Sequence, residues 1–128
     1  MAHVIVEWTD NLVGEFEIRP LLELIAQDMR DNADGVFPIG GIRVRGVKLQ
    51  DYVIADGEEP RDAFINVDVK MGVGRSAAFR QAYFDRLSAR IVEHLDDLFS
   101  RRPLAYSLYV SEVDGWKHNS IHKRLKKA

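Results

Sequence analysis

The sequence has no cysteine, little excess charge of either sign and no long apolar run. The missing thiols exclude a disulfide framework, a cysteine nucleophile and a thiolate metal site. A bilayer helix needs roughly 20 consecutive apolar residues, and the net charge of −2 gives no general attraction to nucleic acid or anionic membranes. Residues 1–10 lack the basic start of a secretory signal. We therefore expect a cytoplasmic protein with no membrane and no nucleic-acid partner.

The composition is that of an ordinary globular protein, since 46% of the 128 residues are hydrophobic and 30% are charged. A chain of this length can bury a proper core within one domain. We predict a single domain over residues 1–128. It would consist of two similar halves, about 1–58 and 59–115, and a polar tail at 116–128.

The first half is expected to form a strand, a helix and a second strand. Residues 3–8 are rich in β-branched side chains, which predicts a strand. Apolar residues at helical spacing predict a helix over 18–32, and Pro20 fits its first turn. Residues 42–47 alternate between apolar and basic side chains and predict a second strand, with 52–54 as its candidate extension.

The second half repeats this order. Residues 63–71 alternate with a period of two, which predicts a strand with one apolar face. A glycine-containing loop at 72–76 leads into a long helix predicted over 77–100. Pro103 ends this helix, and residues 104–113 supply a fourth strand. The expected buried stripe of the helix consists of Phe84, Leu87, Ile91, Leu95 and Leu98.

This order of elements predicts an α+β fold built from tandem βαβ units. Two strands joined through a helix run parallel, so two such units form a four-stranded sheet with both helices on one face. The other face of the sheet would be bare although it carries apolar side chains. Oligomerisation is the simplest way to cover it.

Most familiar signatures of catalysis are absent from the chain. The loop at 72–76 could hold an anion at a helix start, but it lacks the lysine and the spacing of a phosphate loop. His118 and His122 stand four residues apart, yet a metal usually needs a third protein ligand, and we expect no metal site. The serines have no nucleophile-elbow context.

The arginines are more informative. Arg43 and Arg45 share one face of the predicted second strand, whereas Arg75 and Arg80 lie near the start of the long helix. A cation near the positive end of a helix is slightly unfavourable, so Arg75 is not explained as a helix stabiliser. Guanidinium groups bind carboxylates through two parallel hydrogen bonds. These residues indicate a site for a small carboxylated substrate or, alternatively, ordinary surface ion pairs.

Seven segments of the chain carry a more specific pattern. They are residues 3–7 (HVIVE), 36–43 (VFPIGGIR), 55–57 (ADG), 62–64 (DAF), 69–76 (VKMGVGRS), 80–81 (RQ) and 119–122 (NSIH). Together they resemble the 5-carboxymethyl-2-hydroxymuconate isomerase family of the tautomerase superfamily. The resemblance spans nearly the whole chain.

The resemblance implies a fold, an assembly and an activity. It implies two βαβ units per subunit and a homotrimer whose sheets face inward, which would cover the bare face. It implies an isomerase of bacterial aromatic-acid breakdown that converts a 2-hydroxymuconate-type dienol tri-acid to its keto isomer without metal or organic cofactor. Arg43 and Arg75 match the arginines of the family, so by resemblance they bind substrate carboxylates and favour charge on the dienolate.

The chain departs from the family at its start. The family begins Met-Pro-His, and the secondary amine of the proline is the base once the methionine is removed. Here the chain begins Met1-Ala2-His3, so Ala2 would have to supply a free amine in place of the proline. An α-amino group has a pKa of about 7.7–8.0, and nearby arginine charges would lower it. Part of the amine would therefore be neutral at pH 7.

Two main functions are compatible with this sequence. The first is an active isomerase that uses the Ala2 amine as its base. The alternative is a catalytically impaired tautomerase-like protein that binds a small dicarboxylate. A structural role, or a different reaction of the superfamily such as decarboxylation or dehalogenation, also stays open.

Overall fold

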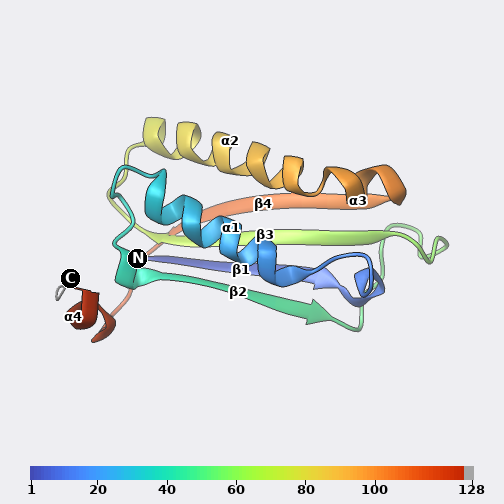
Figure 1. The fold of residues 1–128 in the computed structure, drawn as a ribbon, viewed down its shortest axis with the longest axis horizontal. Helices are drawn as coiled ribbons and strands as arrows, with labels where there is room; N and C mark the ends of the chain where they lie inside the picture. Colours follow the sequence, from blue (N-terminus) through green and yellow to red (C-terminus); the bar gives the residue numbers. More distant parts are fainter. Residues whose placement is uncertain (126–128) are drawn as a thin grey trace.

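A computed structural model describes residues 1–125 and contains a four-stranded sheet with its two long helices on one side (Figure 1). The first unit consists of β1 (Ala2–Thr9), α1 (Ile18–Asp31) and β2 (Ile42–Leu49). The second unit consists of β3 (Ala63–Gly72), α2 (Ala77–His94) and β4 (Leu104–Val113). The short helices are η1 (Asp10–Leu12), η2 (Ile39–Gly41), α3 (Asp96–Arg101) and α4 (Ile121–Leu125). No helix within the described range is long and apolar enough to cross a bilayer.

The strand order of the sheet is β2-β1-β3-β4. β1 pairs in parallel with β2, as does β3 with β4, whereas the two units meet through antiparallel β1 and β3. This confirms the tandem βαβ fold predicted from the sequence. The antiparallel seam also brings the starts of β1 and β2 to the same end of the sheet as the ends of β3 and β4. At that end Ala2 lies opposite Ile42 and Met71, and Gly72 lies opposite Val113.

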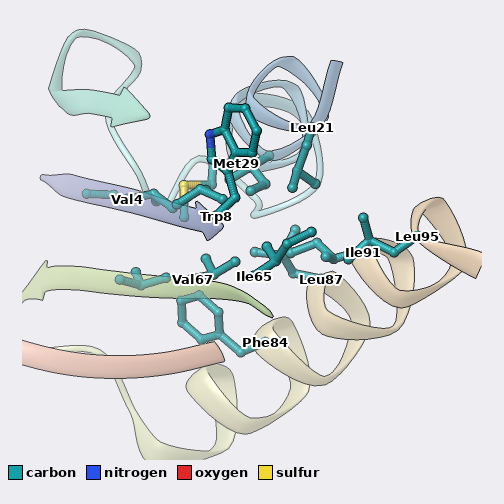
Figure 2. Close-up of a cluster of buried hydrophobic side chains, with 14 of the residues drawn as sticks. Val4, Trp8, Leu21, Met29, Ile65, Val67, Phe84, Leu87, Ile91 and Leu95 are labelled. Carbon is teal, nitrogen blue, oxygen red and sulfur yellow. The ribbon is translucent and has the colours of Figure 1, made fainter. Parts of the chain in front are cut away.

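The core lies between the sheet and the two long helices. The predicted period of two on β3 is confirmed, because Ile65, Val67 and Val69 are buried while the residues between them are at least partly exposed. The predicted stripe of the long helix is buried as well, and Figure 2 shows four of its members against the sheet. Each fully buried side chain of this size contributes roughly 1.5–3 kcal/mol, so burial of this layer strongly favours the folded state.

Two boundaries predicted from the sequence are wrong. The helix predicted over 77–100 is interrupted at Leu95, whose φ of −92° and ψ of 3° lie outside the α-helical region. The apolar stripe continues across this break, so the spacing of the side chains does not reveal it. The extension predicted at 52–54 is not a strand. Tyr52 instead donates its hydroxyl to Asp10 at 2.9 Å, and Val53 is 85% exposed.

A buried carboxylate joins the two long helices. Asp28 on α1 accepts hydrogen bonds from Tyr83 at 2.7 Å and Arg90 at 2.8 Å, both on α2, and from Asn32 at 2.9 Å. Burial raises the pKa of Asp28, but the hydrogen bonds and the charge of Arg90 outweigh it, and the pKa lies below its ordinary value. The pKa of Tyr83 is raised because burial and the neighbouring carboxylate both disfavour its phenolate. Asp28 is therefore ionised near neutral pH and fixes α1 against α2.

Candidate active site

Cationic groups from four separate parts of the chain gather at one end of the sheet. They are the amino group of Met1, Arg43 on β2, Arg75 in the loop after β3 and Lys117 in the segment after β4. Figure 1 places the chain start, the loop from β3 to α2 and the segment leading to α4 at this same end. The antiparallel seam between the two βαβ units is the reason that these segments meet.

The terminal amine lies in a partly buried and electropositive position. Burial lowers the pKa of the Met1 amino group, and the charges of Arg75, Lys117 and Arg43 lower it further. A Cβ atom built on Gly41 would lie 3.2 Å from the Cα atom of Met1, so only a glycine leaves comfortable room for the chain start. The lowered pKa increases the fraction of neutral amine near pH 7, which is the form that can accept a proton.

Arg75 is held in place by backbone and aromatic contacts. Its guanidinium donates hydrogen bonds to the carbonyl of Gly72 at 3.0 Å and to that of Val36 at 3.1 Å. It also lies over the ring of Phe37, with 5.8 Å between its Cζ atom and the ring centre. These contacts fix the position of the group without neutralising its charge.

His3 on β1 lies between two guanidinium groups of β2. Its Nε2 atom is 2.9 Å from Arg43, and its Nδ1 atom is 3.1 Å from Arg45. A neutral imidazole has one acceptor nitrogen and an imidazolium has none, so the two contacts are not both hydrogen bonds at the same time. Burial lowers the pKa of His3, and the charges of Arg43, Arg45, Lys70 and the terminal amine lower it further. His3 is therefore neutral at pH 7.

The cations at this end lack acidic partners in the part of the chain that the structure describes. Within residues 1–125, no carboxylate forms an ion pair with Arg43, Arg45, Lys70, Arg75 or Lys117. Elsewhere on the molecule arginines are paired; Arg102, for example, binds Glu15 at 2.7 Å. An excess of fixed positive charge around an amine suits a ligand that carries several carboxylates.

A sequence model of the 5-carboxymethyl-2-hydroxymuconate isomerase family matches residues 2–125. The chain belongs to this family. A relative from Escherichia coli named 5-carboxymethyl-2-hydroxymuconate Delta-isomerase is 32% identical over 129 residues, covering 98% of this chain and 100% of the relative. The crystal structure of a 5-carboxymethyl-2-hydroxymuconate isomerase from Deinococcus radiodurans R1 has a TM-score of 0.87 and 35% identity, covering 97% of this chain and 93% of that one. A fused 4-OT protein solved as a symmetric trimer shares the fold alone, with a TM-score of 0.52 and 17% identity over 91% and 95% of the two chains.

The fold of this isomerase-family chain places three residues that the sequence singled out, Ala2, Arg43 and Arg75, at the same end of the sheet. The charges of Arg43 and Arg75 both act on the amino group of Met1, and the next residue, Ala2, is the buried first residue of β1. Arg80 is separate from them because it is engaged by Glu112. The sequence alone did not indicate Lys117.

The two histidines of the tail, His118 and His122, differ in their surroundings. His122 packs against Gly40, and its Nε2 atom is 3.4 Å from the side-chain nitrogen of Asn119. No group of three potential ligands among His, Asp and Glu occurs in the part of the chain that the structure describes. His122 therefore belongs to the packing of the tail, whereas His118 is exposed.

The larger hollows of the surface are not lined by the amine or its arginines. One of about 730 Å³ borders α1, β2 and α4 and reaches Gly40 and Ile42, one of about 540 Å³ lies on the sheet beside Tyr109, and one of about 470 Å³ lies between α2 and β4. None of them is lined by Met1, Arg43 or Arg75. The candidate site of this isomerase-family chain is therefore an open end of the sheet rather than one of these grooves.

Proposed function

We propose that the protein is a cofactor-independent isomerase that moves a proton on a 2-hydroxymuconate-type dienol acid in the breakdown of aromatic acids. The names of its relatives give the reaction class. One observation carries the proposal: the partly buried amino group of Met1, one residue from Ala2, has a lowered pKa because Arg43, Arg75 and Lys117 act on it, and none of these three has a carboxylate partner within residues 1–125.

The base in this proposal is the amino group of Ala2 after removal of Met1. The neutral amine accepts the proton of the 2-hydroxyl group, the electron pair shifts through the diene, and the resulting ammonium returns the proton to a carbon of the dienolate. Arg43 and Arg75 hold substrate carboxylates and stabilise the negative charge that develops. The proton moves from oxygen to carbon, so the reaction needs no oxidant and no second substrate.

The primary amine of Ala2 should be a weaker catalyst than the family's proline. General acid–base catalysis typically contributes about 10²–10⁴-fold. An unconstrained amine is less well aimed than a ring nitrogen, and a misplacement of about 1 Å can cost about 100-fold. We therefore expect measurable turnover that lies below that of a family member beginning with proline.

A homotrimer in the cytoplasm is part of the same proposal. The face of the sheet opposite the helices carries Val47 and Tyr109, of which Tyr109 is 63% exposed, among polar and charged side chains such as Arg45 and Asp68. A partner subunit would cover these exposed apolar side chains, and the fused 4-OT trimer shares the fold. The cytoplasmic location carries over from the expectation that we drew from the composition of the chain. Analytical ultracentrifugation tests the assembly, and a monomer at micromolar concentration would contradict it.

A carboxylate-binding protein without turnover is the second candidate. It is favoured by the residue at position 2, which is alanine where the family has proline. Intact mass first establishes whether Met1 is removed, because a retained Met1 moves the amine one residue away. An ultraviolet assay with 5-carboxymethyl-2-hydroxymuconate then measures isomerisation. If a Met1-free protein binds a dicarboxylate but gives no turnover, the second candidate replaces the first.

A further inference from the structure

We propose that Lys117 is a third carboxylate-binding residue of this site and that it selects a tri-acid over a di-acid substrate. The proposal rests on the proposed function of the site and deepens it, because it names the substrate class. The sequence placed Lys117 in a polar tail with no assigned role. In the structure the tail segment is attached on two sides of the cationic site, at the end of β4 and at the turn before β2.

The first attachment lies at the end of β4. Val113, the last residue of this strand, pairs with Gly72 of β3. The carbonyl of Gly72 accepts a hydrogen bond from Arg75 at 3.0 Å. The tail therefore leaves the sheet directly beside Gly72, whose carbonyl binds Arg75.

The second attachment lies on the turn before β2. The side-chain amide of Asn119 donates to the carbonyl of Gly40 at 2.7 Å, and its side-chain oxygen accepts from the amide of Ile121 at 2.9 Å. His122 packs so closely that a Cβ atom built on Gly40 would lie 2.5 Å from its Nδ1 atom. The glycine at position 40 is therefore needed for the tail to dock here.

These two attachments determine where Lys117 lies. Residues 114–118 run from the Arg75 side of the site to Gly40, and the next residue, Gly41, contacts the chain start at Met1. Arg43 follows two residues later on β2. Figure 1 shows this segment passing the chain start on its way to α4. Lys117 consequently lies near enough to the Met1 amine for its charge to act on it, on the segment that runs from the Arg75 side of the site toward the turn before β2.

The charge and freedom of Lys117 suit a ligand rather than a structural role. Its side chain is exposed, and it forms no ion pair with a carboxylate within residues 1–125. Its charge lowers the pKa of the terminal amine more than that of Arg43 does. An ammonium group on a flexible stem has three donors and adapts to the position of a carboxylate. Three cations around one amine match the three carboxylates of a tri-acid, whereas a di-acid would leave one of them unused.

Steady-state kinetics on two substrates tests the proposal. The variant is Lys117→Met, and the matched control is Lys123→Met, which removes an exposed lysine of the same tail that does not act on the amine. The substrates are the tri-acid 5-carboxymethyl-2-hydroxymuconate and the di-acid 2-hydroxymuconate. Loss of a hydrogen bond between charged groups predicts a fall of about 10- to 100-fold in kcat/KM for the tri-acid, mainly through KM.

The di-acid substrate and the control variant show whether the loss of kcat/KM is specific to the tri-acid and to Lys117. We expect kcat/KM for the di-acid to change by less than about 3-fold in Lys117→Met, Lys123→Met to behave like the wild type, and Lys117→Arg to retain the preference for the tri-acid. A loss of equal size on both substrates overturns the proposal, because it would mean that Lys117 acts through the amine alone.

A binding measurement separates this proposal from the proposed isomerase activity. Calorimetry with propane-1,2,3-tricarboxylate and glutarate requires no turnover. We expect the wild type to prefer the tricarboxylate and Lys117→Met to lose that preference. If the wild type turns over neither substrate but shows this difference, the isomerase activity is wrong while the role of Lys117 stands. If Lys117→Met binds the tricarboxylate as tightly as the wild type does, the proposal for Lys117 is wrong.

Discussion

The guanidinium group of Arg75 lies over the ring of Phe37, 5.8 Å from the ring centre. Phe37 is buried and packs edge-on against Tyr83, with 5.5 Å between the two ring centres. The hydroxyl of Tyr83 in turn binds Asp28 on the other long helix. Contacts therefore run without interruption from the buried carboxylate between the helices to the cation at the end of the sheet. The helical layer positions Arg75 as well as covering the sheet.

Phe37→Leu should lower kcat/KM by about 3- to 30-fold, because a cation–π contact contributes about 0.5–2 kcal/mol and Arg75 would lose its aromatic support. Steady-state kinetics measures this change. The control is Phe84→Leu, which alters a buried ring that contacts both Phe37 and Tyr83. The control should lose stability but keep its kcat/KM. Equal kinetic losses in the two variants would show that the effect comes from the core and not from Arg75.

Arg75→Ala should weaken substrate binding and turnover together, and it should also change the pH profile. The base acts in its neutral form, so activity falls as the pH drops below the pKa of the amine. In the structure the pKa of the Met1 amino group lies below 8.0, partly because of the charge of Arg75, and we expect the Ala2 amine one residue further on to respond to this charge in the same direction. Removing the charge raises the pKa, and the acid limb of kcat/KM moves to higher pH. Rates measured across the pH range test this shift.

Arg75→Lys is the matched variant for this prediction. It keeps the positive charge but lacks the planar donor pair that binds a carboxylate bidentately. We expect its acid limb to stay near that of the wild type while its KM rises. Kinetics of Arg75→Ala that match the wild type in both rate and pH profile would refute the role of Arg75.

Ala2→Pro should raise isomerase activity by up to about 100-fold, since the ring fixes the direction of the amine. Without Met1, position 2 has no peptide N–H, so the proline removes no backbone hydrogen bond at the start of β1. The measurement is the ultraviolet assay on protein whose intact mass proves removal of Met1. A folded and processed variant that is inert would mean that the scaffold lacks more than its base.

The sequence predicts the order of elements because side-chain periodicity records which face of each element is buried. The alternation of β3 and the stripe of α2 are both of this kind, and both are confirmed. The turn at Tyr52 could not be predicted in this way, because its partner Asp10 lies 42 residues away. No local pattern contains a contact of that range.

The candidate site likewise contains some residues that the sequence indicates and others that it does not. Arg43 and Arg75 could be found from the resemblance to a family, although nothing in their own spacing requires them to meet. The position of Lys117 depends on the bond between Asn119 and Gly40, which are 79 residues apart. His3 faces Arg43 only through the register of two parallel strands. Such relationships follow from strand pairing and tail docking, and they become visible only in three dimensions.

The buried carboxylate of Asp28 should make stability depend on pH in a defined direction. Its pKa in the folded protein lies below the ordinary value of 3.8, so its contribution is fully present above that value. The contribution is lost as the pH falls from there through the folded pKa, since the unfolded chain then binds the proton more readily. At pH 7 we expect Asp28→Asn to lower the free energy of unfolding by about 2 kcal/mol, because charged hydrogen bonds to Tyr83 and Arg90 are lost.

Urea unfolding at a series of pH values from neutral to about pH 3 measures this dependence. The difference between the wild type and Asp28→Asn should shrink as the pH falls below 3.8, because the protonated carboxyl loses the advantage that the charged one had. Asp85→Asn is the control, since Asp85 is exposed on α2 and bonds only to Gln81 among residues 1–125. It should change stability by less than about 0.5 kcal/mol at every pH. A constant difference between the wild type and Asp28→Asn over the whole range would mean that shape, and not charge, is what Asp28 contributes to the junction of the two helices.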